Sequence, residues 1–223
     1  MFEGVSTYFP QLLDGLVLTL QVALGSFLVG FVIAMVAAPL RVSGGPVAKR
    51  VIGTYVTVVR GLPELLIIFL VFYGGTVLLT KLVGSYVEVD ALTAGIAALS
   101  VVSGAYLTEI LRAALLAVPI GQWEAAKSLG LRPKQAFFRV ILPQMLQRAL
   151  PGLGNQWLVI LKESALVSIV GLEELMRKSV VAAGATHNPL GFYLTAALLY
   201  VLVTTVSTIV FELANRRLSI HAR

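Results

Sequence analysis

The chain has 223 residues, of which 58% are hydrophobic and only 13% are charged, and its mean hydropathy is +0.91. Soluble domains carry about 45–50% apolar and about 25% charged residues, so this composition excludes an ordinary soluble protein and predicts an all-α integral membrane protein. The chain contains no cysteine, which excludes disulfides, Cys-ligated zinc and thiol chemistry. The length fits a single transmembrane domain over residues 1–223.

Five apolar stretches follow one another along the chain, each with few or no charges. They are residues 15–40, 65–80, 91–108, 149–172 and 186–211. A bilayer core of about 30 Å needs about 20 apolar residues in a helix, so we expect five transmembrane helices. The second stretch is short, and we expect its helix to extend back past residues 61–64.

Basic residues collect in the first and third connections between these spans and in the C-terminal tail. This distribution predicts the orientation of the chain. The expected cytoplasmic side holds Arg41, Lys49, Arg50 and Arg60, then Arg112, Lys127, Arg132, Lys134, Arg139 and Arg148, and finally Arg216, Arg217 and Arg223. On the opposite side acidic residues are in the majority, Glu3 and Asp14 among them. Because cytoplasmic loops retain Lys and Arg, the N-terminus is expected outside and the C-terminus in the cytoplasm. This bias accounts for the net charge of +6 without any nucleic-acid binding.

Small residues recur at four-residue spacing in the first and third spans. One set is Gly30, Ala34 and Ala38, and the other is Ser100, Gly104 and Thr108. Each set lies on one face of its helix, a pattern typical of close helix packing in membranes.

The third connection, about residues 119–143, has the composition of a cytoplasmic element. Residues 123–129 are mostly good helix formers, and Gly130 follows where a left-handed residue would end a helix. Pro133 is placed to open a second helix, and Pro143 to end or kink it. We expect two short helices that form a protruding knob. The alternative is an amphipathic connector that lies on the lipid headgroups.

Ionisable residues at membrane depth are costly and therefore functional candidates. Glu163, in the fourth span, is a candidate to receive the cationic group of a substrate, and Ser164 is a candidate to hydrogen-bond it. Ser103 and Tyr106 are further candidates to line a cavity. The alternative for Glu163 and its neighbour Lys162 is a position near the membrane interface, where both would snorkel to water.

Other charged groups are interpreted as structural. Glu109 and Arg112 are three residues apart on a helix and are expected to form an ion pair. Residues 171–185, which include Glu173 and Glu174, are expected to form an outward-facing amphipathic helix that closes the cavity. The two histidines, isolated in sequence, suggest no metal site.

Several of these segments together resemble the permease subunits of bacterial binding-protein-dependent ABC importers. The run Glu124-Ala125-Ala126, with Gly130 and then Leu142-Pro143, resembles the EAA loop of that family, although Val140 stands where the family usually has Ile. Residues 60–64, 104–109 and 161–166 resemble the polar-amino-acid branch, in particular the Q-type subunits of histidine and lysine/arginine/ornithine permeases and of octopine and nopaline permeases.

The resemblance implies a type I ABC importer permease fold (MetI-like) in the bacterial inner membrane. It implies transport of polar, basic amino acids or opines by alternating access. Glu124, Ala125, Ala126 and Gly130 would dock on the ATPase, and Leu142 and Pro143 would close the loop. The implied partners are an ATP-binding subunit dimer, a periplasmic solute-binding protein, and a second homologous permease subunit in a heterodimer or homodimer. Membrane lipid would surround the spans.

The chain contains no Gly-x-x-x-x-Gly-Lys-[Ser/Thr] phosphate loop, so we expect it to carry no cofactor and no ATPase site of its own. ATP and Mg²⁺ would bind to the partner ATPase. The first rival is an ion-coupled secondary amino acid transporter, which would favour buried carboxylates and inverted repeats. An intramembrane enzyme and a scaffold without transport activity are the others.

Overall fold

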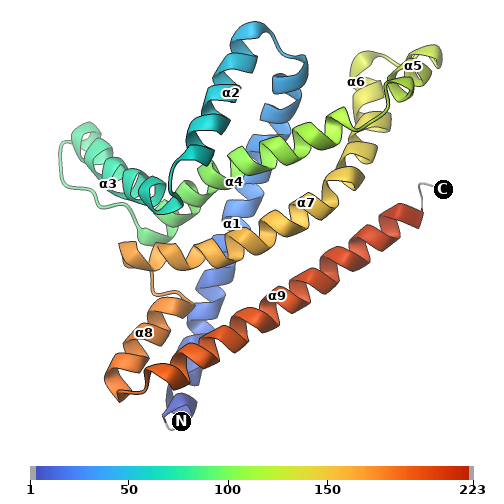
Figure 1. Cartoon of the computed structure of the whole chain (residues 1–223). Helices are drawn as coiled ribbons and strands as arrows, with labels where there is room; N and C mark the ends of the chain where they lie inside the picture. The colour runs from blue at the N-terminus through green and yellow to red at the C-terminus, as the bar shows by residue number, and fades with distance from the viewer. Residues whose placement is uncertain (1–3, 221–223) are drawn as a thin grey trace.

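The computed structural model describes residues 4–220, with side chains for residues 4–217, and this part of the chain is helical with short connections (Figure 1). Glu3 and Arg223, which entered the predicted orientation, lie outside the described residues. The elements in chain order are α1 (Val5–Ser43), α2 (Pro46–Gly61), α3 (Glu64–Val83), α4 (Ala91–Leu116), α5 (Ile120–Ser128), α6 (Pro133–Ala136), the π-turn Phe137–Ile141, α7 (Leu142–Glu163), the 3₁₀ segment Ser164–Val170, α8 (Leu175–Thr186) and α9 (Pro189–Ile220).

Four helices of the described chain are long and apolar enough to cross a membrane. They are α1, α3, α4 and residues Pro189–Arg217 of α9. The expected fourth span, residues 149–172, falls on α7 and the 3₁₀ segment and is not among them. Polar residues such as Asn155, Gln156 and Lys162 interrupt it, and its α-helical part ends at Glu163.

The expected extension of the second span through residues 61–64 is wrong. Helix α2 ends at Gly61, and Leu62 and Pro63 have extended backbone angles before α3 begins at Glu64. A proline disfavours the helical conformation in the residue before it, so Leu62 cannot continue α2. The result is a break between α2 and α3, with Pro63 at the N-cap of α3.

Helix α4 is central to the fold, because α1, α2, α3 and α7 all pack on it (Figure 1). The predicted small-residue faces of α1 and α4 are buried, and they meet where a Cβ atom on Gly30 would lie 2.0 Å from the Ser103 Oγ. The structure therefore confirms close packing of these two helices through small residues.

We expect Gly30→Val to destabilise the protein by about 1–3 kcal/mol, because overpacking forces the helices apart. The matched control is Gly53→Ala in α2, where an added Cβ has no atom within 4 Å and replacement of a helical glycine stabilises by about 0.5–1 kcal/mol. Thermal unfolding in detergent measures the stability of both variants. Equal unfolding temperatures for the two variants would contradict the packing argument.

The two ends of the molecule carry different short helices. Helices α5 and α6 lie at the end where the C-terminus lies, and α8 lies at the other end with the N-terminus (Figure 1). At the α8 end, Leu12 of α1, Leu175 of α8 and Phe192 of α9 form a small buried cluster. The knob and α8 are therefore held on opposite sides of the apolar helices.

Candidate docking and translocation sites

The knob is built from α5 and α6, which meet at a glycine as predicted. Gly130 has a φ of +75°, and its N–H donates to the carbonyl of Lys127 (3.0 Å), while the N–H of Leu131 donates to that of Ala126 (3.1 Å). This pair of hydrogen bonds is the Schellman arrangement that ends a helix at a left-handed residue. Helix α5 begins at Ile120, three residues before the expected start, because Pro119 already forms its N-cap.

The second half of the knob runs directly into the membrane part. Pro133 opens α6 as predicted, but α6 already ends at Ala136, so the expectation that Pro143 ends this helix is wrong. The chain passes from α6 through the π-turn into α7, with Pro143 in the first turn of α7. A proline inside an α-helix lacks an N–H and collides with the carbonyl four residues earlier, and the wider π-turn just before it accommodates both effects.

The expected docking residues differ in exposure. Glu124 and Ala125 are exposed, whereas Ala126 is buried within the chain, so only one of the two alanines is open to a partner. Ile120 and Leu129 at the two ends of α5 are 72% and 80% exposed. Leu142 is half-buried against the core and Pro143 is exposed.

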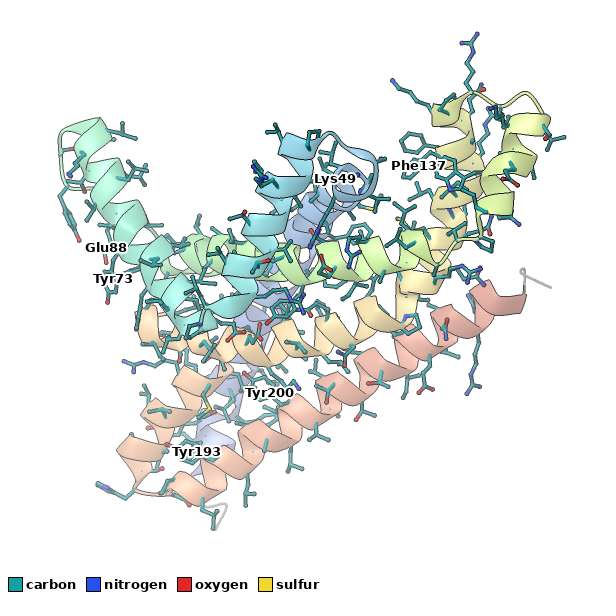
Figure 2. All side chains as sticks on the ribbon, turned by 45° about the horizontal axis from the view of Figure 1, so that its top comes forward. Lys49, Tyr73, Glu88, Phe137, Tyr193 and Tyr200 are labelled. Atoms are coloured by element: carbon teal, nitrogen blue, oxygen red, sulfur yellow. The ribbon has the colours of Figure 1, made fainter. Side chains whose placement is uncertain are left out.

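Aromatic packing fixes α5 against the second half of the knob. The rings of Trp123 and Phe137 stack with centroids 6.5 Å apart, and Phe137 is labelled in Figure 2. An open groove of about 420 Å³ runs between the two helices, lined by Trp123, Glu124, Lys127, Leu131, Pro133 and Ala136. The knob is a braced unit whose surface exposes apolar side chains together with acidic and basic ones.

The two serines proposed for the substrate cavity do not face one. Ser103 is fully buried, and its hydroxyl donates to the carbonyl of Ser26 on α1 (2.9 Å). Ser164 is also fully buried, and its hydroxyl donates to the carbonyl of Leu161 (2.7 Å). The Ser164 hydroxyl bonds to the backbone of its own turn, as helical serines commonly do, whereas the Ser103 hydroxyl joins α4 to α1.

Glu163 and Tyr106 are placed differently. Glu163 ends α7, and its Oε2 atom is buried without a hydrogen-bond partner among the described residues. The carboxylate of Glu64, at the start of α3, lies close enough to repel it. Tyr106 is half-buried on α4, and the guanidinium carbon of Arg60 lies 5.1 Å from its ring centroid.

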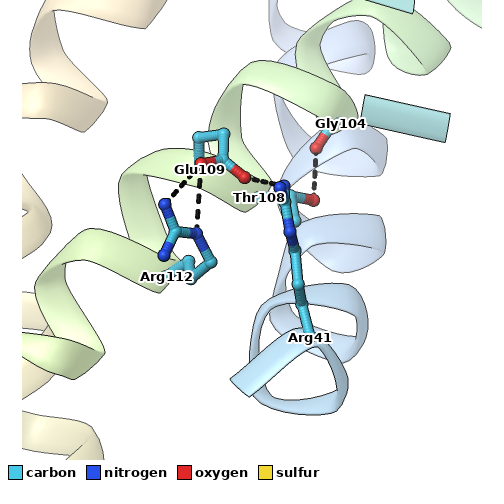
Figure 3. Close-up of polar contacts among 5 residues, drawn as sticks. All are labelled: Arg41, Gly104, Thr108, Glu109 and Arg112. Atoms are coloured by element: carbon cyan, nitrogen blue, oxygen red, sulfur yellow. Dashed lines mark hydrogen bonds and ion pairs between the residues drawn. The ribbon is translucent and has the colours of Figure 1, made fainter. Parts of the chain in front are cut away.

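The predicted Glu109–Arg112 ion pair is confirmed and has a third member (Figure 3). Arg112 donates from its Nε and Nη2 atoms to one oxygen of Glu109, at 3.1 and 2.9 Å. Arg41, at the end of α1, donates to the other oxygen. Sequence reasoning missed Arg41 because the contact joins residues far apart in the chain, and it bridges α1 to α4.

The helix expected over residues 171–185 forms only from Leu175 onward, and Glu174 is its N-cap. Its side chain is fully buried and caps α8, accepting hydrogen bonds from the N–H groups of Met176 (2.9 Å) and Arg177 (2.8 Å). It also accepts from the hydroxyls of Thr19 on α1 (3.2 Å) and Tyr200 on α9 (3.3 Å). Figure 2 labels Tyr200. Glu174 thus connects α1, α8 and α9.

Long apolar helices with a braced knob at one end are the architecture of a multi-pass membrane protein. The chain belongs to the family of binding-protein-dependent transport system inner membrane components, whose model matches residues 8–220. This family is the membrane permease of ABC transporters, so ATP is hydrolysed by a partner subunit and solute is delivered by a binding protein.

Two relatives indicate to which branch of the family the chain is similar. The chain is 42% identical to the nopaline transport system permease protein NocQ of Agrobacterium fabrum, over 92% of this chain and 89% of that protein. It is 38% identical to the histidine/lysine/arginine/ornithine transport system permease protein HisQ of Salmonella typhimurium, over 100% of this chain and 96% of that protein.

Solved structures agree with the fold. An amino acid ABC transporter crystallised with histidines superposes with a TM-score of 0.84 at 34% identity, covering 97% of this chain and 98% of that one. An inward-facing structure of the MetNI methionine ABC transporter superposes with a TM-score of 0.76 at 21% identity, covering 93% and 96%. The second likeness supports the MetI-like helical fold alone.

Proposed function

We propose that this subunit carries basic amino acids or opines across the inner membrane by alternating access. The observation that carries the proposal is the unpartnered carboxylate oxygen of Glu163 with Glu64 beside it. Two acidic side chains at membrane depth create a negative site that favours a cation. Both relatives named above support a nitrogen-rich or basic substrate by their names, nopaline in one and histidine, lysine, arginine and ornithine in the other.

Helix α7, continued by the 3₁₀ segment, serves in this proposal as the fourth of five spans, with the N-terminus outside and the C-terminus in the cytoplasm. The opposite positions of the two termini support an odd number of spans (Figure 1). The exposed side of α7 carries Arg148, Asn155 and Lys162. Such groups are costly against lipid, so this side is proposed to face an aqueous pathway and a second homologous permease subunit, which forms a heterodimer with this chain.

The knob is proposed to be the coupling element that seats on the ATPase dimer. Support comes from its position at the same end of the molecule as the C-terminus (Figure 1), which is expected in the cytoplasm, and from its exposed residues Ile120, Glu124, Ala125 and Leu129. Exposed apolar side chains on a protruding, braced element are typical of a protein interface. Gly130 sets the angle at which α5 is presented.

Reconstitution of the permease with its ATPase and binding protein in proteoliposomes tests the proposal. We expect uptake of arginine that needs ATP and the binding protein, is blocked by vanadate and is unaffected by a protonophore. Uptake that needs an ion gradient and no ATPase would instead establish the ion-coupled secondary transporter.

The role of Glu163 is tested by Glu163→Gln, which removes the charge and keeps the shape. Loss of a charged partner costs about 1.5–3 kcal/mol, so we expect arginine uptake to fall about ten- to hundredfold, while uptake of a neutral amino acid changes little. The control is Glu88→Gln, at an exposed position between α3 and α4. Equal losses for arginine and the neutral substrate would remove the charge-recognition role.

A further inference from the structure

Arg60 lies at membrane depth. It is the penultimate residue of α2, directly before the break that precedes α3. Its guanidinium stacks over Tyr106, which lies near the middle of α4, a helix long and apolar enough to span the membrane. The sequence had placed Arg60 with the cytoplasmic basic residues, so this contact moves it inward.

This guanidinium has no anionic partner within the described part of the chain. The three ion pairs of residues 4–217 do not include Arg60. Glu109, on the same helix as Tyr106, has both oxygens occupied by Arg41 and Arg112. Arg41 and Arg60 also repel one another. An unpaired cation at membrane depth is costly, and Arg60 is exposed, so it is open to an anion from outside the chain.

Gln156 supplies a second vacant donor at the same level. An added Cβ on Gly152 of α7 would lie 2.8 Å from the Ile110 side chain of α4, and the two helices run in opposite directions (Figure 1). Gln156 lies one turn after Gly152 on α7, and Tyr106 lies one turn before Ile110 on α4. Because the helices are antiparallel, Gln156 and Tyr106 are at the same level. Gln156 is only 5% exposed, and its Nε2 atom has no hydrogen-bond partner among the described residues.

Two acidic residues occur on the elements around the α2–α3 break. Glu64 follows Arg60 by four residues across the α2–α3 break. The buried Glu163, whose Oε2 atom has no hydrogen-bond partner among the described residues, is close enough to Glu64 for the two carboxylates to repel one another. One unpaired cation and two carboxylates therefore belong to the segments around the α2–α3 break and the end of α7. Such a set of charges matches a small molecule that carries both a carboxylate and a cationic group.

We propose that Arg60 is a binding residue for the carboxylate of the transported amino acid, with Gln156 as a second donor and Glu163 on the cationic group. The ring of Tyr106 holds the guanidinium in place. This inference rests on the proposed function, since it names how the same pathway recognises its substrate. The ligand class is an amino acid or opine with at least one carboxylate and one ammonium or guanidinium group.

The first test is equilibrium binding of arginine and of agmatine, which is arginine without its carboxylate, to the purified permease–ATPase complex. A charge-assisted carboxylate contact corresponds to about a ten- to hundredfold difference in affinity. We expect the wild type to bind arginine tighter by that factor, and Arg60→Gln to remove the difference. Equal affinities in the wild type, or an unchanged ratio in Arg60→Gln, would overturn the proposal. This test needs no transport.

The second test separates binding from structure in proteoliposomes that contain the binding protein. We expect Arg60→Gln to lower arginine uptake about ten- to hundredfold, with ATPase stimulation by the liganded binding protein within about twofold of the wild type. Arg60→Lys and Tyr106→Phe should retain most uptake, and the control Arg50→Gln, exposed on the same helix, should retain all of it. A parallel loss of uptake and stimulated ATPase in Arg60→Gln would assign a structural role instead. A wild type without binding-protein-dependent uptake would contradict the proposed function, whereas the binding ratio above would still decide the role of Arg60.

Discussion

Gly130→Val is expected to abolish transport and binding-protein-stimulated ATPase activity while the permease still inserts into the membrane. The φ of +75° at Gly130 is one that a β-branched residue adopts only under strain. That strain, about 1–3 kcal/mol, is enough to open the terminal turn of α5. Among the described residues, no atom lies within 4 Å of the position of an added Cβ, so the effect comes from the backbone and not from a collision.

Opening this turn changes how α5 is presented to the ATPase. The hydrogen bonds from the N–H groups of Gly130 and Leu131 set the angle between α5 and α6. Without them, the exposed residues at the two ends of α5, Ile120 and Leu129, no longer keep a fixed relation to the membrane part. Nucleotide-driven motion of the ATPase would then not reach the transmembrane helices.

Gly84→Val is the matched control. Gly84 ends α3 with a φ of +79° and has nothing within 4 Å of an added Cβ, so the backbone strain is the same but lies away from the knob. Membrane yield, ATPase activity and uptake are measured for both variants, and Gly130→Asn, whose side chain tolerates this conformation, should recover most coupling. Retained transport in Gly130→Val, or equal uncoupling in Gly84→Val, would sink the coupling assignment.

Local signals in the sequence predicted much of the architecture. The end of α5 at Gly130 and the start of α6 at Pro133 depend on the conformational preferences of single residues, which neighbours rarely overrule. The Glu109–Arg112 pair is likewise a matter of spacing along one helix. Apolar length alone found α1, α3, α4 and α9.

Contacts between residues far apart in the chain could not be predicted from such local signals. Arg41 read as a loop cation, yet its partner is Glu109 on another helix. Ser103 read as a cavity residue, although its small size serves the contact between α1 and α4. Glu173 and Glu174 are identical in type and adjacent, so no pattern could tell which one turns inward. That choice depends on Thr19 and Tyr200, which reach Glu174 only in the folded chain.

Glu174→Ala is accordingly expected to lower stability strongly, by at least about 3 kcal/mol. Four donors now share this carboxylate, two from the first turn of α8 and two from the hydroxyls of Thr19 and Tyr200. A carboxyl group offers two acceptor oxygens, so it suits a site where its neighbours are donors. Removing it leaves buried donors unpaired, at about 1–3 kcal/mol each, and removes the N-cap of α8.

Glu173→Ala is the neighbouring control. Glu173 is exposed and paired only with Lys178, whose hydrogen bond keeps the pKa of this carboxyl below its usual range. Its replacement should leave the unfolding temperature within about 2 °C of the wild type, as surface substitutions usually do. Unfolding in detergent is followed through the fluorescence of the two tryptophans.

A series of single and double variants tests whether Glu174 connects α1, α8 and α9 or only caps α8. Tyr200→Phe and Thr19→Val each remove one hydroxyl donor and should each cost about 0.5–1.5 kcal/mol. Once Glu174 is alanine, each change should cost less, because its hydrogen bond to Glu174 is already gone. Thr19→Val should keep a residual cost, because the Thr19 hydroxyl also bonds to the carbonyl of Gly15 (3.1 Å) and accepts from the N–H of Leu175 (3.2 Å). Double-mutant cycles measure this coupling directly. Additive losses throughout would show that α1 and α9 are held at this end by the apolar contacts of Leu12, Leu175 and Phe192 alone, with Glu174 confined to the first turn of α8.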